Sequence, residues 1–412
     1  MHSPLPPRNG AFSRRDFLQT TALFTMAGAA APWRLLAEEK VTLPFANGER
    51  SLVKYPQKRP LIQLTSRPPQ LETPFKVFNE SVITPNDAFF VRYHLANIPT
   101  EIDVETFRVE VKGKVNTPLV LSVADLKKQF EAVEIVAVNQ CSGNSRGFSS
   151  PRVSGGQLAN GAMGNARWRG VRLKDVLEKA GVAAGAKQVT FDGLDTAVIP
   201  QTPDFIKALD IDHALGGEVM LAYEMNGEDL PMLNGYPLRL VVPGYYGTYW
   251  VKHLSEITVV DGLFDGFWMS TAYRIPNTPG ACILPGTTPK STVPIGRFNV
   301  RSFITSLTDG ATIPIKRETL VRGIAFDGGA GISEVLVSSD GGHNWRAAML
   351  GKELGNYSFR EWTIPLTPAA SGPLELKVKA TNRLGESQPV EALWNPPGYM
   401  RNVIETVKVN AA

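Results

Sequence analysis

Residues 133–146 read VEIVAVNQCSGNSR, and the fold is decided around this stretch. The apolar run 133–138 has the length and the β-branched content of a buried strand. The loop that follows contains Cys141 and Arg146, so the sulfur is expected at a strand end, near free backbone N–H groups and a guanidinium. Such surroundings favour a thiolate, which can act as a nucleophile or as a metal ligand. The competing interpretation makes Cys141 a small buried hydrophobe.

Two further clusters of polar residues and turn formers lie beside predicted strands, at 89–94 (FFVRYH) and 164–168 (GNARW). Ligands of α/β domains tend to bind at such strand ends. Because side chains alternate between the faces of a strand, Arg92 and His94 are expected on the same face. A guanidinium and an imidazole placed together form an anion pocket, although a surface salt bridge explains the same pattern.

The other periodic segments predict a mixed α and β domain. Helices are predicted at 122–130 and 173–180, and strands at 89–94, 107–112, 133–139, 188–192 and 239–242. Ser122 is a suitable N-cap, and Gly181 is a suitable helix stop. No GxGxxG follows a strand, and strands and helices do not alternate regularly, which disfavours a dinucleotide-binding fold.

A change of composition after Pro276 marks a linker rich in proline and glycine. Beyond it, residues 334–338 and 374–380 alternate apolar and polar side chains, and Asp340-Gly341-Gly342 forms a turn signal. We therefore predict an α+β protein. A mixed α/β domain is expected over 84–278, and the linker plus an all-β, immunoglobulin-like sandwich over 279–412.

The first residues are expected to be an export signal. The sequence Ser13-Arg14-Arg15-Asp16-Phe17-Leu18 precedes a weakly hydrophobic run that ends near Ala37. This pattern predicts a twin-arginine signal peptide over 1–37 and a periplasmic protein that is exported already folded. The run is too short and too rich in Ala, Gly and Thr for a membrane anchor, which is the alternative. Residues 38–83, rich in Pro, Lys and Arg, are predicted to form an extended arm.

Composition argues against several other functions. Part of the formal charge of +4 comes from the first fifteen residues, so the folded part lacks the basic stripe of a nucleic-acid binder. The two cysteines, Cys141 and Cys282, and five scattered histidines form no CxxC, CxxCH, HxH or HxxxH motif. A zinc site and a haem attached to this chain are therefore not expected. Cys282, in the linker, is assigned no role.

A series of motifs resembles the sulfite oxidase family of molybdopterin enzymes, in order and from about residue 84 to the C-terminus. The matching segments are FFVRYH (89–94), QCSGNSR (140–146), GAMGNARWRG (161–170), LAYEMNG (221–227), GYPLR (235–239), PGYYG (243–247) and VKHL (251–254). The resemblance implies oxidation of sulfite to sulfate by oxygen-atom transfer at a molybdopterin-bound molybdenum. It also implies that the sandwich is the family's dimerisation domain.

The same resemblance implies roles for individual residues. Cys141 becomes the thiolate ligand of molybdenum, and the substrate is surrounded by Arg92, Arg146, Trp168 and Tyr273. Guanidinium groups suit a compact dianion because they offer paired donors that stay charged. The pterin and its phosphate are assigned to Phe90, Arg92, His94, Cys141, Ser142, Asp195, Asn234, Arg239 and Lys252. Asp204 competes with Asp195, and Asn234 stands where relatives often have His.

Electrons released by this reaction need an acceptor, and a c-type cytochrome is expected, either as a tight subunit or as a transient partner. A homodimer and a heterodimer both stay open. One alternative is a periplasmic molybdopterin reductase of methionine sulfoxide, which Arg92, Arg146 and the sandwich disfavour. Another is a non-catalytic periplasmic anion-binding protein. Nitrate reduction is a weaker alternative, because the sequence shows no haem or flavin module.

Overall fold

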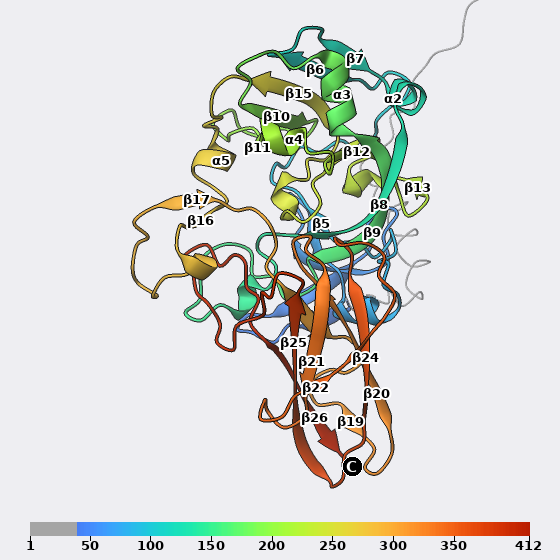
Figure 1. Cartoon of the computed structure of the whole chain (residues 1–412), viewed down its shortest axis with the longest axis vertical. Helices are drawn as coiled ribbons and strands as arrows, with labels where there is room; N and C mark the ends of the chain where they lie inside the picture. The colour runs from blue at the N-terminus through green and yellow to red at the C-terminus, as the bar shows by residue number, and fades with distance from the viewer. Residues whose placement is uncertain (1–38) are drawn as a thin grey trace, which may run out of the picture. The chain divides into compact units, whose positions relative to one another are not determined.

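Strands dominate residues 39–412, which are the residues that the computed structural model describes (Figure 1). The expected signal peptide, residues 1–37, lies outside the described residues. A mixed α/β domain is followed by a domain built of strands, which confirms the predicted α+β class. No helix in the described part of the chain has the length and apolar character needed to cross a membrane.

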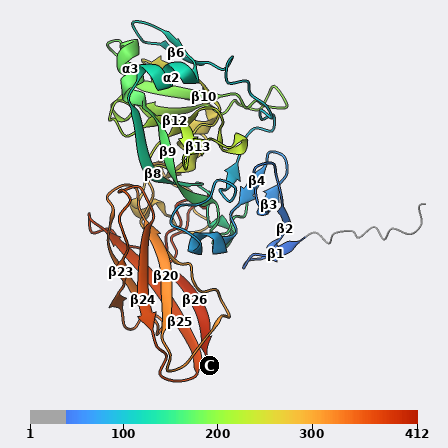
Figure 2. The same cartoon turned by 90° about the vertical axis from the view of Figure 1, so that its right-hand side faces the viewer.

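Residues 40–92 contribute a five-stranded antiparallel sheet where an extended arm was expected. Figure 2 shows its first four strands side by side. In order, the strands are β1 (Lys40–Thr42), β2 (Glu49–Val53), β3 (Leu61–Thr65), β4 (Gln70–Glu72) and β5 (Val91–Arg92). Leu61 and Leu71 are buried in it. Prolines divide the segment into strands too short to show a periodic pattern, which is why the prediction missed them.

Two sheets form the domain that follows. The first has the order β11 (Lys207–Asp210), β10 (Gln188–Gly193), β15 (Leu254–Val260), β6 (Val109–Gly113) and β7 (Leu119–Leu121). The second has the order β13 (Glu228–Asp229), β12 (Met220–Met225), β9 (Met163–Arg172) and β8 (Ala132–Gln140), with β14 (Arg239–Val241) paired to β12. The strands predicted within 107–112, 133–139, 188–192 and 239–242 are thus confirmed.

Both predicted helices are present, with the expected ends. They are α2 (Val123–Gln129) and α3 (Leu173–Ala180). The described chain also contains the short helices α4 (Ile211–Ala214) and α5 (Phe267–Ser270). Ser122 caps α2: its Oγ accepts from the Asp125 N–H at 3.0 Å, and Asp125 accepts from the Ser122 N–H at 3.0 Å. Gly181 ends α3 with a φ of 68°, a conformation that favours glycine. Short 3-10 turns are η1 (Phe75–Asn79), η2 (Arg146–Phe148), η3 (Met232–Asn234), η4 (Gly247–Tyr249) and η5 (Pro279–Ala281).

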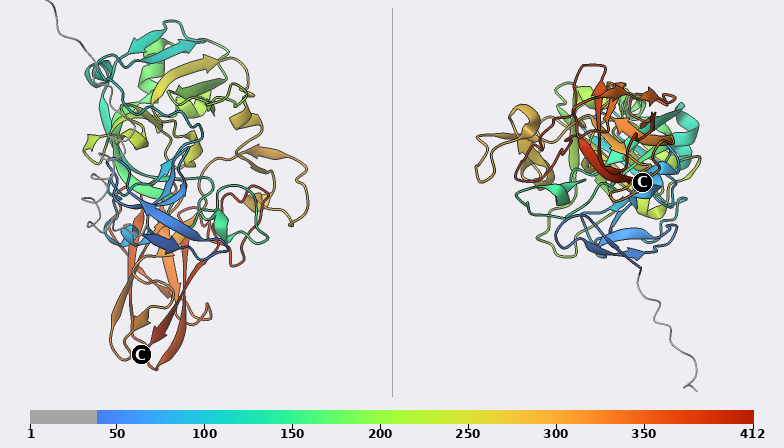
Figure 3. Two further views of the ribbon diagram at one scale, coloured as in Figure 1. Left: turned by 180° about the vertical axis from the view of Figure 1, so that it is seen from behind. Right: turned by 90° about the horizontal axis from the view of Figure 1, so that it is seen from below.

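The C-terminal domain consists of two sheets packed face to face, as a sandwich (Figure 3). One sheet has the order β18 (Arg301–Ile304), β20 (Thr319–Phe326), β24 (Arg360–Leu366) and β23 (Met349–Leu350). The other has the order β19 (Thr312–Ile313), β26 (Glu405–Ala411), β25 (Gly372–Asn382), β21 (Ile332–Ser338) and β22 (Arg346–Ala347). The predicted strands 334–338 and 374–380 lie within β21 and β25. Trp362 and Leu376 are fully buried in the core between the sheets.

The proline-rich linker is the loop of a hairpin. Strands β16 (Arg274–Pro276) and β17 (Thr292–Pro294) pair antiparallel on either side of it. Contacts from the C-terminal domain return to this region and to the first domain. Asn395 Nδ2 donates to Ala281 O at 3.1 Å, and Trp394 Nε1 donates to Pro151 O at 2.8 Å. Hydrogen bonds thus join the C-terminal domain to the linker hairpin and to the segment that follows the Cys141 loop.

Gly323 in β20 is a sensitive point of the sandwich. A Cβ at this position would lie 2.0 Å from Phe303 O and 2.2 Å from Cζ2 of Trp362. Gly323→Ala is therefore expected to destabilise the protein by about 1–3 kcal/mol through overpacking, measured as a lower midpoint of thermal unfolding. Gly262→Ala is the control, because nothing lies within 4 Å of its Cβ position. An unchanged midpoint for Gly323→Ala would contradict this packing.

Candidate active site

One cavity brings together most of the predicted site residues. The predicted residues on its wall are Phe90, Arg92, His94, Cys141, Ser142, Asn234, Arg239, Lys252 and Tyr273. The rest of the lining consists of Phe89, Asn139, Phe205, Leu233, Gly247, Thr248 and Trp250. Segments far apart in the sequence thus meet at one space, and no carboxylate is among the lining residues.

Cys141 lies directly after the end of β8, as its sequence context predicted. It is a free cysteine that is 8% exposed and faces the cavity. Its backbone N–H donates to Ala162 O at 2.9 Å, and its carbonyl accepts from the Asn144 N–H at 3.0 Å. The loop therefore holds the thiol on a cavity wall, which favours the ligand interpretation over that of a core hydrophobe.

Arg92 and His94 both line the cavity, but not for the predicted reason. Strand β5 ends at Arg92, so the alternation of a strand does not place His94. Instead, the imidazole stacks on Phe205 with ring centroids 3.8 Å apart, and its Nε2 pairs with the hydroxyl of Tyr273. Burial, reinforced by the charge of Arg92, holds the pKa of His94 well below its ordinary value. The imidazole is therefore neutral in this site.

Tyr273 presents its hydroxyl from a left-handed backbone conformation, with φ at 58°. Such a conformation is strained for a residue other than glycine and persists where surrounding contacts fix it. Here the ring stacks on Tyr399 of the C-terminal domain, with centroids 5.5 Å apart and an interplanar angle of 6°. Burial raises the pKa of Tyr273, although Arg92 opposes this effect. The hydroxyl thus keeps its proton and can donate a hydrogen bond.

Buried cations form another part of the wall. Arg239 is 3% exposed and donates to Asn234 O at 2.8 Å, while Lys252 Nζ donates to Arg92 O at 2.7 Å. Burial lowers the pKa of Arg239 to about 9. Burial also lowers the pKa of Lys252 to about 7, against the opposing charge of Asp195. These groups bond to carbonyls and not to carboxylates, so their charge is available to an anionic ligand.

Two predicted substrate residues, Arg146 and Trp168, are not on the cavity wall. Arg146 donates through Nε to Pro397 O at 2.9 Å, and its guanidinium lies 4.9 Å from the Tyr399 ring centre. Trp168 is fully buried, donates to Ala137 O at 3.0 Å and lies beneath the guanidinium of Arg239. Trp168 thus supports Arg239 from behind, and the expectation that it borders the substrate does not agree with this position.

The two candidate aspartates, Asp195 and Asp204, differ in burial and in their partners. Asp195 is 6% exposed and interacts with the charge of Lys252, whereas Asp204 is exposed and accepts from the Phe205 N–H. Burial raises the pKa of Asp195, and Lys252 counteracts this effect. Neither residue lines the cavity, but each lies beside a residue that does: Asp195 interacts with the charge of Lys252, and Asp204 bonds to the backbone of Phe205.

Besides the unpredicted residues of the cavity lining, three neighbouring residues were not predicted: Lys58, Lys207 and Tyr399. Lys58 is 2% exposed, and its Nζ donates to Asn234 Oδ1 at 2.5 Å and to Phe89 O at 3.1 Å. Lys207 is 1% exposed and lies 5.3 Å from the centre of the Tyr273 ring. The apolar surroundings of Lys207 in FIKAL are a detectable signal of burial, whereas nothing local marks Lys58 or Tyr399.

The cavity fits a polar, anionic cofactor such as molybdopterin. Four buried polar atoms of lining residues have no hydrogen-bond partner: Asn139 Oδ1, Ser142 Oγ, Arg239 Nε and Thr248 Oγ1. Buried polar atoms are normally paired, so these four are available to a bound group. Within residues 39–412 there is no cluster of three or more His, Cys, Asp or Glu side chains that could hold a metal ion. A metal here would thus rely on Cys141 and on a cofactor for its ligands.

Comparison with known proteins agrees with this arrangement. The oxidoreductase molybdopterin binding domain matches residues 94–268, and the Mo-co oxidoreductase dimerisation domain matches residues 292–412. Sulfite oxidase of Gallus gallus is 32% identical over 361 residues, covering 84% of this chain and 77% of that protein. The chain belongs to the sulfite oxidase family. Its predicted molybdopterin domain and dimerisation domain are thereby confirmed.

Other members of the family match over a similar range. Sulfite oxidase of Arabidopsis thaliana is 30% identical over 381 residues, covering 87% of this chain and 96% of that protein. Mitochondrial sulfite oxidase of Rattus norvegicus is 33% identical over 372 residues, covering 86% of this chain. The aligned part spans 66% of the rat protein's length.

The fold also occurs in a solved structure, that of the sulfane dehydrogenase SoxCD from Paracoccus pantotrophus. The TM-score is 0.71 at 24% sequence identity, and the match covers 92% of this chain and 91% of the other. The likeness therefore extends through both domains of the described chain.

The buried position of Lys207 gives stability a pH dependence. Burial lowers the pKa of Lys207 from 10.5 to about 7, so the unfolded chain binds more protons than the folded one between these values. The destabilising contribution of Lys207 is therefore full below about pH 7 and is relieved as the pH rises toward 10.5. Lys207→Met should be stabilised relative to wild type by a few kcal/mol more at pH 7 than at pH 10.

This difference is measured by chemical unfolding of both cofactor-free proteins across that pH range. Lys114→Met is the control, because Lys114 forms a surface ion pair with Asp261 at 2.9 Å. A difference between wild type and Lys207→Met that does not change with pH would show that the ammonium is not destabilised by burial.

Proposed function

We propose that this chain oxidises sulfite to sulfate at a molybdenum centre held by molybdopterin and by the sulfur of Cys141. The observation that carries the proposal is that Cys141 shares one cavity with Arg92 and with the buried cations Arg239 and Lys252. The sulfite oxidases of rat, chicken and Arabidopsis thaliana align with 86%, 84% and 87% of the chain, which supports the same reaction.

The residues beside Cys141 suit a small oxyanion. Arg92 offers paired N–H donors that stay charged, and Tyr273 offers a neutral hydroxyl that His94 orients. Arg146 adds positive charge from behind Tyr399, and its charge acts on Tyr273. Donors fixed by the fold can stabilise the charge that develops during reaction, because they need not reorganise.

The cofactor would be held by the buried cations and by the unpaired polar atoms of the cavity lining. Arg239, Lys252 and Asn234 are placed to bind a phosphate, while the unpaired atoms of Asn139, Ser142 and Thr248 are available to the polar ring system. When bound, the molybdenum centre supplies oxygen-atom transfer and accepts the electrons. Cys141 supplies the protein ligand.

Conversion of sulfite and water to sulfate releases two protons and two electrons, so an acceptor is required. We propose a c-type cytochrome, because the sequence contains no CxxCH motif of its own and begins with a twin-arginine pattern typical of periplasmic export. The cytochrome is either a stable subunit or a transient partner. The match to a dimerisation domain makes a second copy of the chain the other candidate partner.

The proposal is tested with the purified protein. Elemental analysis is expected to find one molybdenum per chain, and sulfite is expected to drive reduction of a c-type cytochrome in steady-state assays. A protein without molybdenum would support the anion-binding alternative. A protein that contains the metal, ignores sulfite and oxidises a reduced dye with methionine sulfoxide would instead support the reductase.

Arg92→Gln removes a charged donor from the cavity and leaves a shorter, neutral amide. The Michaelis constant for sulfite is expected to rise about ten- to hundredfold, with normal molybdenum content, because a hydrogen bond to a charged group is lost. Arg167→Gln is the control: this residue lies in β9, forms a surface pair with Glu134 at 3.5 Å and should behave as wild type. An unchanged constant for Arg92→Gln would remove Arg92 from the substrate site.

Cys141→Ser replaces the proposed metal ligand by a poorer one. Turnover of sulfite is expected to fall below detection while the circular dichroism spectrum and the thermal midpoint stay close to wild type. Cys282→Ser is the matched control, because Cys282 lies in the linker hairpin, away from the cavity lining. Near-normal turnover by Cys141→Ser would refute the ligand assignment.

A further inference from the structure

Ser145 lies in the short loop between Cys141 and Arg146 and has an unusual conformation. Its φ is 71°, in the left-handed region that residues other than glycine rarely adopt. It is also fully buried, and its N–H donates to Ala159 O at 2.6 Å. A conformation of this kind persists only where its surroundings determine it.

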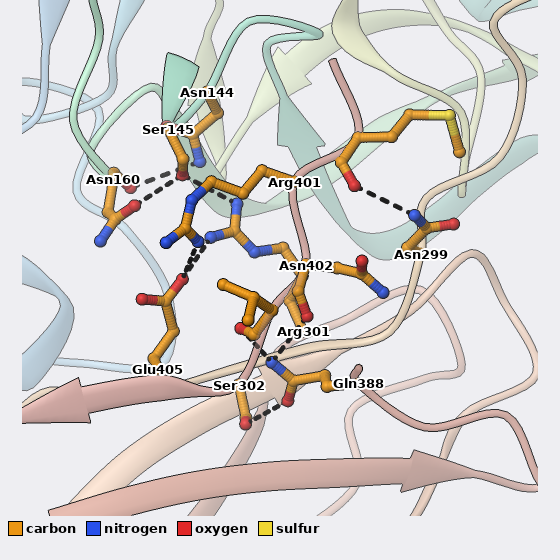
Figure 4. Close-up of polar contacts among 12 residues, drawn as sticks. Asn144, Ser145, Asn160, Asn299, Arg301, Ser302, Gln388, Arg401, Asn402 and Glu405 are labelled. Carbon is orange, nitrogen blue, oxygen red and sulfur yellow. Dashed lines mark hydrogen bonds and ion pairs between the residues drawn. The ribbon is translucent and has the colours of Figure 1, made fainter. Parts of the chain in front are cut away.

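The group that contacts the Ser145 side chain from the other domain is Arg301, at the start of β18 in the sandwich (Figure 4). Its Nη1 donates to Ser145 Oγ at 3.0 Å, and Ser145 Oγ in turn donates to Asn160 Oδ1 at 2.5 Å. Arg301 is 1% exposed. The hydroxyl of Ser145 is therefore held by a guanidinium of the second domain and by an amide of the first.

Arg301 is itself oriented by the last strand of the chain. Its Nη2 donates to Glu405 Oε1 at 2.8 Å, and its guanidinium lies 4.5 Å from the centre of the Phe303 ring. Glu405 also pairs with Arg401 at 3.4 Å, as Figure 4 shows. Within this cluster, Glu405 is the carboxylate that both arginines contact.

Stability alone does not account for this arrangement. Burying an ion pair costs desolvation that the attraction repays only in part, and apolar residues of similar size often serve stability as well. Arg301 Nε is buried without a partner, so the guanidinium is not fully satisfied. Buried ionic groups can instead select one conformation, and the conformation that Arg301 contacts is that of the loop carrying Cys141 and Arg146.

We propose that Arg301 is a positioning residue through which the C-terminal sandwich sets the backbone of loop 141–146. The Arg301–Ser145 bond holds Ser145 in its left-handed conformation, so that Cys141 on one side and Arg146 on the other keep their directions. A second contact acts in the same sense, since Arg146 Nε donates to Pro397 O of the C-terminal domain at 2.9 Å. The dimerisation domain is in this way part of the active site. The effect on catalysis rests on the proposed function, whereas the effect on the loop does not.

Two variants break the same bond from opposite ends. Ser145→Ala removes only the hydroxyl, and Arg301→Met removes the guanidinium while Glu405 keeps Arg401 as its partner. Both are expected to speed hydrogen exchange of the amides of residues 144–149 about tenfold, and to raise the Michaelis constant for sulfite about tenfold with little change in kcat. The double variant should be no worse than either single one, because the same interaction is lost.

Arg360→Met is the matched control, because Arg360 pairs with Glu353 at 3.6 Å within the same sandwich and is 19% exposed. It should leave exchange in the loop at the wild-type rate. Effects of the two single variants that multiply in the double variant, or a loop whose exchange is unchanged in Ser145→Ala, would overturn the proposal. So would a loosened loop with an unchanged Michaelis constant. Should the wild type fail to oxidise sulfite, the proposed function falls, and the exchange data alone decide whether Arg301 orders the loop.

Discussion

Positive charge that no carboxylate neutralises is the constraint on which this structure depends. Arg92, Arg239 and Lys252 face one cavity, and no acidic residue lines it. The fold directs these cations with backbone carbonyls, such as Asn234 O for Arg239 and Arg92 O for Lys252. A carbonyl orients a cation without cancelling its charge, so the attraction is reserved for a ligand. Burial lowers the pKa of both Arg239 and Lys252, so keeping these groups charged in the cavity has an energetic cost.

Aromatic rings stabilise the buried charge of this cavity. Trp168 and Trp250 lie 4.9 and 5.6 Å from the guanidinium carbon of Arg239, which gives a buried charge a favourable surface. Elsewhere in the lining, His94 is stacked on Phe205, and Tyr273 is stacked on Tyr399. Each of the two side chains is stacked on one ring, and the Tyr273 hydroxyl and His94 Nε2 pair with each other, so both polar atoms have a defined partner. The cavity thus combines aromatic packing around His94 and Tyr273 with buried charge at Arg239 and Lys252.

Much of the fold and the position of Cys141 were predictable from the sequence, because the signals for them are local. The apolar strand before Cys141, the capping box at Ser122 and the glycine after α3 were each detectable within a few residues. Trp168 was expected at the substrate but lies behind Arg239, because a short motif does not say which side of a strand faces the ligand. Lys58 and Tyr399 were missed because their importance arises from contacts across 176 residues and between domains. Such contacts leave no periodic pattern.

The contact between Lys58 and Asn234 has a consequence for biosynthesis. These residues are 176 positions apart, and Arg146 reaches Pro397 across 251 positions. Contacts of such high sequence separation form late, because the intervening chain must first be closed into a loop. During translation, the loop that carries Cys141 therefore acquires its contacts with Arg301 and Pro397 only after the C-terminal sandwich has left the ribosome.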